Sequence, residues 1–128
     1  FTLDTHGQDY LQTSEGKGLP VVHCVKGTKG WELSSLLQPY FPYAAKVFEK
    51  GAFGSLPLAE YLRAEQFDWV ELCGLVSNIC VLSNAILAKA ALPGATIQVD
   101  ARATAAADQE LHQKALDLMT CLQIDVVR

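Results

Sequence analysis

The most apolar part of the chain lies between residues 69 and 92 and predicts a strand followed by a helix. Trp69–Cys73 is a short, mostly apolar run that stops at Gly74, as is typical of a strand in a covered parallel sheet. Residues 78–92 are too long and too rich in Ala and Leu for a strand, and Pro93-Gly94 would end the helix that they predict. Ser77 or Asn78 is expected to cap this helix.

The remaining hydrophobic pattern alternates in the same way between short apolar runs and amphipathic segments. It predicts strands at 1–3, 19–25, 43–48, 96–99 and 124–127, helices at 31–40, 57–66 and 105–122, and a polar loop at 7–18. This alternation favours an α/β fold with a doubly wound, mostly parallel sheet and helices on both faces. A ligand site is then expected outside the carboxyl ends of the strands.

Composition narrows the class of protein. The 128 residues suit one domain, residues 1–128, and 50% hydrophobic with 19% charged residues is a globular composition. A net charge of -4 without a basic run argues against nucleic acid as a partner, and no apolar run is pure enough for a membrane span. Four widely spaced cysteines without a C-x-x-C motif indicate a reduced, cytoplasmic protein.

Polar side chains with possible chemistry fall at the ends of the predicted strands. Asp4 and His6 follow the first strand and His23 ends the second, while Lys50 lies between an apolar strand and a glycine-containing loop and Asp100 ends another strand. Carboxylate and imidazole are ligands for zinc, iron or manganese, and an Asp-x-His pair on extended backbone points both side chains to one side. The alternative is a polar turn with solvated histidines and a solvated lysine.

Cys80 falls in the first turn of the predicted helix. The unpaired N–H groups of a helix start favour the thiolate form, which would lower the pKa of the thiol, and they could also hold an oxyanion. The alternative is a small buried cysteine that only fills space.

Four segments of the chain carry the candidate residues, namely GLVSNICVLSNAILAKA at 74–90, VFEKGAFGS at 47–55, LDTHGQDYL at 3–11 and LPVVHCVKGTKGWEL at 19–33. Together they resemble the isochorismatase-like cysteine hydrolases, and in particular their nicotinamidase branch. The resemblance implies that Cys80 is the catalytic cysteine and Lys50 the catalytic lysine. It also implies a divalent metal, zinc or else iron or manganese, held by Asp4, His6 and His23.

The chemistry implied by the resemblance is hydrolysis of a small amide such as nicotinamide. Cys80 would attack the carbonyl carbon, ammonia would leave, and water would hydrolyse the thioester. The backbone amides of Val76 and Cys80 would stabilise the oxyanion, with a cis peptide between Leu75 and Val76, while Lys50 would hold the general acid/base. The metal would bind the pyridine nitrogen or supply water.

The sequence departs from the family pattern in two places. The family's catalytic aspartate ends an earlier strand, so we expect it on a segment upstream of Phe1. A further histidine that some nicotinamidases carry soon after the Asp-x-His pair is absent, and water could take its place. Trp31 is expected either to wall the substrate pocket or to pack a loop, and His112 is expected at the surface.

Other functions stay open at this point. A related hydrolase could act on a different small amide or a carbamoyl compound, whereas Cys80 disfavours vinyl-ether chemistry, which uses no cysteine. An inactive, metal-binding relative is the alternative outside the enzymes. The helix at 78–92 is apolar nearly all round, which favours a homo-oligomer in addition to a small-molecule substrate.

We predict that Cys80 reacts with iodoacetamide faster than the other three cysteines near neutral pH, because a helix start favours its thiolate. Peptide mapping after limited alkylation measures the order of reaction. Earlier modification of Cys24, Cys73 or Cys121 would contradict the prediction.

Overall fold

The computed structural model describes all residues from Phe1 to Arg128. The chain forms two compact units, Phe1–Ala52 and Phe53–Arg128, each of which is described by itself. Both contain parallel strands and helices, which confirms the predicted parallel α/β fold class. None of the helices has the length and apolar character needed to cross a membrane. A single domain over 1–128 stays a prediction.

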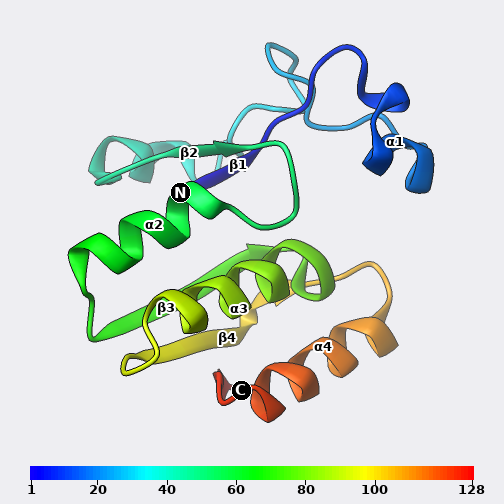
Figure 1. Cartoon of the computed structure of the whole chain (residues 1–128). Helices are drawn as coiled ribbons and strands as arrows, with labels where there is room; N and C mark the ends of the chain where they lie inside the picture. Colours follow the sequence, from blue (N-terminus) through cyan, green and yellow to red (C-terminus); the bar gives the residue numbers. More distant parts are fainter. The chain divides into compact units, whose positions relative to one another are not determined.

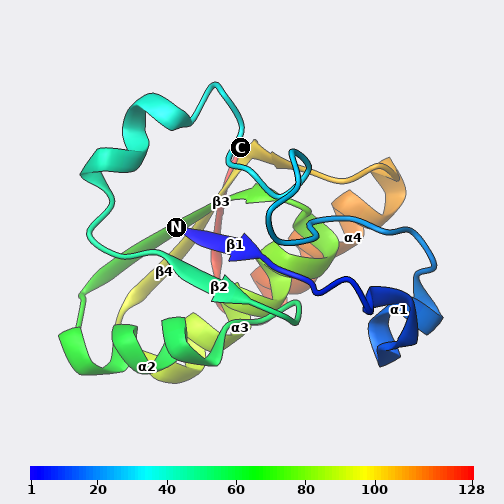
Figure 2. The same ribbon diagram turned by 90° about the horizontal axis from the view of Figure 1, so that it is seen from above.

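The first unit is built on two short parallel strands, β1 (Thr2–Asp4) and β2 (Phe48–Lys50), which lie side by side in Figure 2. Their register places Asp4 opposite Lys50. The rest of the unit contains short helical turns, namely η1 (Tyr10–Gln12), α1 (Ser14–Gly18) and η2 (Gln38–Tyr43). The carboxyl ends of β1 and β2 therefore lie together, and the long connection between the two strands consists of turns and short helices.

Four predictions for this unit are wrong. The strand predicted at 43–48 begins only at Phe48, because Tyr43 still belongs to η2. The segment 7–18 is not a plain loop, because it contains η1 and α1 around the buried Tyr10. The segment 19–25 forms only an isolated bridge between Val25 and His6; Pro20 has no N–H to donate. The predicted helix at 31–40 is a series of turns that leads into η2, where prolines remove helical hydrogen bonds.

The second unit is a three-stranded parallel sheet with its strands in chain order, β3 (Trp69–Leu75), β4 (Thr96–Ala105) and β5 (Asp125–Val127). Its helices are α2 (Leu56–Glu65), α3 (Leu82–Ala91) and α4 (Gln109–Cys121), and a π-helical turn, η3 (Ser77–Val81), precedes α3 (Figure 1). The predicted order of strands and helices is confirmed here. β4 runs past its predicted end at Asp100 after a register shift against β3, and α4 starts later than predicted because Asp108 caps it.

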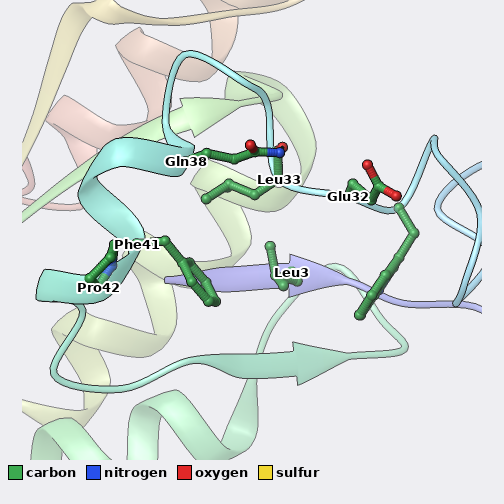
Figure 3. A pocket seen from close by; sticks show the side chains of 7 residues that line it. Leu3, Glu32, Leu33, Gln38, Phe41 and Pro42 are labelled. Atoms are coloured by element: carbon green, nitrogen blue, oxygen red, sulfur yellow. The ribbon is translucent and has the colours of Figure 1, made fainter.

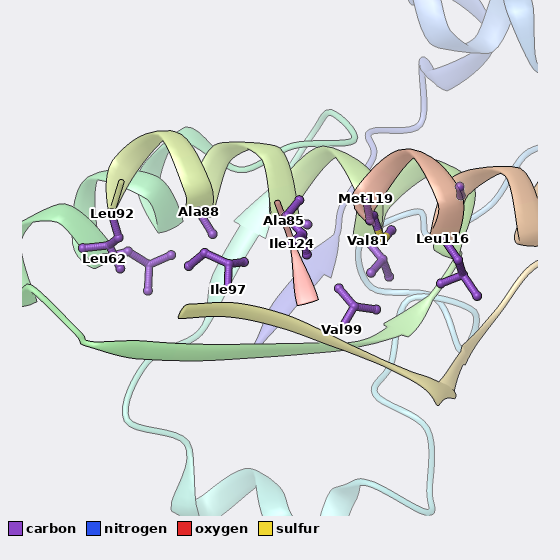
Figure 4. Packing of buried hydrophobic residues seen from close by; sticks show 11 residues of the cluster. Leu62, Val81, Ala85, Ala88, Leu92, Ile97, Val99, Leu116, Met119 and Ile124 are labelled. Carbon is purple, nitrogen blue, oxygen red and sulfur yellow. The ribbon is translucent and has the colours of Figure 1, made fainter. Parts of the chain in front are cut away.

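The hydrophobic core of the second unit lies between the helices α3 and α4 and one face of the sheet (Figure 4). Ile97 and Val99 of β4 point toward Ala85 and Ala88 of α3 and toward Met119 of α4, and all five are buried. Alternate residues of β3 point to the other face and are exposed, as the period of two along a strand requires. Val70 and Leu72 of β3 pack against this core, which holds in place the strand that leads into η3.

We predict that Met119→Ala lowers the free energy of unfolding by about 2 to 5 kcal/mol, because it leaves a cavity at a side chain with no solvent exposure. The neighbouring Leu118 is 53% exposed, so Leu118→Ala is the control and should cost less than about 1 kcal/mol. Urea unfolding of the two variants measures the difference. Equal losses would contradict the packing shown in Figure 4.

Candidate metal centre and nucleophile turn

The end of β1 gathers the polar residues that the sequence placed at two strand ends. The His6 amide donates to the Cys24 carbonyl at 2.9 Å, and the Lys26 amide donates to the His6 carbonyl at 2.9 Å. These two bonds hold the segment before Lys26 against the chain that leaves β1. His23 therefore reaches the same place as Asp4 and His6, as the sequence predicts.

Four side chains converge at this point: Asp4, His6, Glu15 and His23. His6 Nε2 lies 3.6 Å from Asp4 Oδ2 and 3.5 Å from Glu15 Oε1. His23 Nε2 lies 3.6 Å and 3.7 Å from the same two oxygens. All four ligand atoms lie within 4.8 Å of one another, so two imidazoles and two carboxylates surround one point. We call these four residues the metal-ligand cluster.

The geometry of the metal-ligand cluster fits a divalent ion better than a set of hydrogen bonds. The separations are too long for charge-assisted hydrogen bonds, which measure about 2.7 to 2.9 Å. His6 Nε2 and Glu15 Oε1 are buried and have no hydrogen-bond partner, which is costly for polar atoms. Four ligands at about 2.0 to 2.2 Å from a tetrahedral zinc ion would be roughly 3.3 to 3.6 Å apart, close to the 3.5 to 3.7 Å between the histidine nitrogens and the carboxylate oxygens.

Glu15 is the member of the cluster that sequence reasoning missed. It lies in the first turn of α1, where Thr13 Oγ1 accepts from the Gly16 amide at 3.0 Å. Gly16 is required because a Cβ there would overlap the Tyr10 carbonyl oxygen, so only glycine lets this turn pack so closely. The Thr-Ser-Glu sequence at 13–15 is a helix-start signal that could have identified the turn, although not its contact with the histidines.

The imidazole of His23 is oriented by a second contact. His23 Nδ1 donates to the Val21 carbonyl at 2.7 Å, which leaves the Nε2 lone pair of the neutral ring facing the cluster. The buried Tyr10 ring packs against His6 and His23, with ring centroids 4.6 and 5.0 Å away, and its hydroxyl donates to the Leu19 carbonyl at 2.8 Å. Burial, and then the charges of Glu15 and Asp4, raise the pKa of Tyr10, so the ring stays neutral.

Lys50 joins the cluster through Asp4. Its Nζ donates to Asp4 Oδ1 at 3.0 Å and to the Ala52 carbonyl at 3.1 Å, and its side chain is only 4% exposed. Asp4 therefore offers one oxygen to the histidines and the other to a buried ammonium group. The positive charge offsets part of the repulsion between the two carboxylates of the cluster.

A pocket of about 370 Å³ opens on the first unit beside β1. Trp31 is among its lining residues, and Figure 3 shows the side chains of Leu3, Leu33 and Phe41 gathered around it. The Trp31 indole N–H donates to Thr5 Oγ1 at 2.9 Å, next to Asp4 and His6 in sequence. Trp31 thus both lines a pocket and anchors a loop, and its contact with substrate stays a prediction.

In the second unit, Cys80 lies on the π-helical turn η3, directly after β3. Gly74 has φ +109°, a conformation that favours glycine. The peptide bond between Leu75 and Val76 is cis, which confirms the predicted cis peptide. The Val76 carbonyl accepts from the Ile79 amide at 3.2 Å and from the Val81 amide at 3.1 Å. Cys80 is therefore on the first helical turn after the strand, as predicted, although the turn is π-helical.

Asn84 holds the turn from inside the protein. Its Nδ2 donates to the Cys80 carbonyl at 2.8 Å and to the Phe53 carbonyl at 3.0 Å, and its Oδ1 accepts from the Ser55 amide at 2.9 Å. The residue is 5% exposed. A buried amide with three such partners fixes the main chain of Cys80 relative to residues 53–55, a function that sequence reasoning missed because Asn84 was counted only as an interruption of the apolar helix.

Three other predictions around this turn are wrong. Neither Ser77 nor Asn78 caps the helix, since no side-chain bond caps η3. Ser77 Oγ instead shares a 2.8 Å hydrogen bond with His112 Nδ1, so His112 is a partly buried, paired residue. Asp100 does not end its strand, and it accepts from the Arg102 guanidinium and the Arg102 amide, bonds that lower the pKa of the carboxyl group.

Comparison with known proteins places this geometry in a family context. A model of the isochorismatase domain matches residues 1–127. No curated protein matches the chain by sequence comparison.

Several solved structures share the fold. The nicotinamidase of Bacillus subtilis is 28% identical with a TM-score of 0.83, and the match covers 100% of this chain and 73% of that one. The pyrazinamidase/nicotinamidase of Streptococcus mutans is 31% identical with a TM-score of 0.83, covering 99% and 74%. The pyrazinamidase of Pyrococcus horikoshii, solved in complex with zinc, is 26% identical with a TM-score of 0.82, covering 99% and 73%.

We predict that Glu15→Gln weakens zinc binding by about tenfold or more, because a neutral amide replaces a charged ligand whose oxygen is buried without another partner. Competition with a chromophoric chelator at fixed pH measures the affinity. Glu65→Gln, which removes an exposed carboxylate of α2, is the control and should bind zinc as the parent does. Equal affinity in the two variants would remove Glu15 from the ligand set.

Proposed function

The chain belongs to the isochorismatase family, and on this premise we propose that it is a metal-assisted cysteine amidohydrolase that hydrolyses nicotinamide or a close analogue to the acid and ammonia. The metal-ligand cluster is the observation that carries the proposal. Cysteine hydrolysis alone would not require two imidazoles and two carboxylates around one point, with two buried ligand atoms left without a hydrogen-bond partner.

Cys80 is the proposed nucleophile. Its Sγ forms a bond to the amide carbonyl carbon, the C–N bond breaks, and the thiol proton leaves on the nitrogen as part of ammonia. Water then adds to the thioester carbon, and the C–S bond breaks to release the carboxylic acid and the thiol. The backbone amides of Val76 and Cys80 are the proposed donors to the oxyanion in both steps.

The metal-ligand cluster would supply the recognition of the substrate. Asp4, His6, Glu15 and His23 would hold the ion, and the zinc complex among the similar structures favours zinc. When bound, the ion supplies a Lewis-acid site for a ring nitrogen or for water. The similar structures are named as nicotinamidase and pyrazinamidase. The substrates in these names, nicotinamide and pyrazinamide, both carry a ring nitrogen that could bind a metal ion.

Lys50 is proposed to hold and polarise the general acid/base of the reaction. A lysine side chain that is only 4% exposed has lost most of its hydration, and a facing carboxylate compensates for that loss. Asp4 is one such carboxylate. Trp31 is proposed to wall the substrate pocket, which is supported by its place in the lining of the pocket beside β1.

We predict that the full-length, zinc-loaded protein releases ammonia from nicotinamide and that Cys80→Ala lowers this rate by at least about 10³-fold, because no other group forms the thioester. Ammonia release measured by a coupled assay is the readout, and Cys121→Ala, at an exposed cysteine of α4, is the matched control.

Benzamide separates the two parts of the proposal, because it has the amide but lacks the ring nitrogen. Hydrolysis of nicotinamide but not of benzamide, lost on removal of the metal by a chelator, is the expected result. Release from a carbamoyl compound alone would move the assignment to another hydrolase of the family. No release from any small amide would indicate an inactive relative.

A further inference from the structure

A partly buried hydrogen bond joins the turn that carries Cys80 to a helix that the proposed chemistry does not use. Ser77 Oγ and His112 Nδ1 lie 2.8 Å apart, although 35 residues separate them in the chain. Ser77 has no solvent exposure. It opens η3, and His112 lies in the first turn of α4, which packs directly against η3.

We propose that His112 is a positioning residue for the reaction and that it acts through Ser77 on the turn that carries the proposed oxyanion donors. This inference rests on the proposed function. Ser77 follows Val76 directly and precedes Cys80 by three residues, so the two proposed donor amides flank it in sequence. A change in the direction of the Ser77 backbone would therefore move the Val76 amide and change its position relative to the Cys80 amide.

Side-chain hydrogen bonds hold both ends of the turn. Side-chain caps fix many helix starts, and η3 has none. The serine hydroxyl, which could have capped the turn, instead bonds the imidazole of another element. At the other end, Asn84 binds the Cys80 carbonyl. Ser77 and Asn84 thus hold the start and the end of the turn independently.

The chemistry of the pair suits a fixed role. A hydroxyl both donates and accepts, so the bond persists whether Nδ1 carries a proton or a lone pair. A buried hydroxyl without a partner is costly, and truncation of His112 would leave Ser77 free to rotate and its backbone free to shift. Misplacement of reacting groups by about 1 Å can cost about 100-fold in rate.

The test is a double-mutant cycle on nicotinamide hydrolysis by the intact, zinc-loaded protein. We expect His112→Ala and Ser77→Ala each to lower kcat by about 10- to 100-fold with KM changed by less than about twofold, since they alter orientation rather than ground-state binding. The double variant should be no slower than either single variant, because both remove one interaction. Lys114→Ala, at an exposed residue of α4, is the control.

His112→Asn distinguishes positioning from mere packing. The asparagine side-chain amide can place a hydrogen-bonding atom near the position of Nδ1, so this variant should recover most of the kcat lost in His112→Ala. Independent, additive losses in the cycle, or no recovery in His112→Asn while the unfolding midpoint is that of the parent, would overturn the proposal.

The rate of Cys80 alkylation by iodoacetamide separates this inference from the proposed function. A parent that is inactive on all small amides would refute the function. Even with an inactive parent, the positioning role of the Ser77–His112 hydrogen bond would be supported if His112→Ala and Ser77→Ala change the alkylation rate equally and His112→Asn restores it. If the alkylation rate and kcat are the same in all variants, the positioning role of His112 is refuted and the proposed function is not affected.

Discussion

The polar site of the first unit depends on the carboxyl group of Asp4, because its two oxygens contact different neighbours. One oxygen faces the two histidines of the metal-ligand cluster, and the other accepts from the buried Lys50 ammonium group. The parallel register of β1 and β2 produces this arrangement by placing the two residues opposite each other. Without Lys50, two carboxylates would share a poorly solvated site with less positive charge to balance them, which is unfavourable.

The second unit holds the turn that carries Cys80 by polar side chains and not by helix capping. Asn84 satisfies three main-chain groups, and Ser77 pairs with His112, so both ends of the turn are tied to other elements. Such networks specify one arrangement because any other leaves a polar atom unpaired in a low-dielectric interior. The apolar core between α3, α4 and the sheet supplies the stability on which this specificity is built.

Much of the fold was predictable because hydrophobic periodicity is a local property of the chain. The right type of element in the right order was predicted for residues 57–66, 69–73, 78–92 and 105–122, with errors mainly at the ends. The same pattern failed between residues 7 and 47, where turns, prolines and short helices replace regular periods. There the structure follows from hydrogen bonds to distant residues, such as those between His6 and residues 24–26.

The sequence by itself determined which residue types were available for chemistry, and its family resemblance predicted that Asp4, His6 and His23 would lie together. They meet although His23 is not on a strand, because backbone hydrogen bonds between His6 and residues 24–26 hold that segment beside the end of β1. The cis bond before Val76 was also predictable from the family resemblance. Only the tertiary structure decided that Glu15 joins the cluster and that His112 pairs with Ser77. Both contacts join segments whose separation carries no periodic signal, so they depend on how the backbone packs in three dimensions.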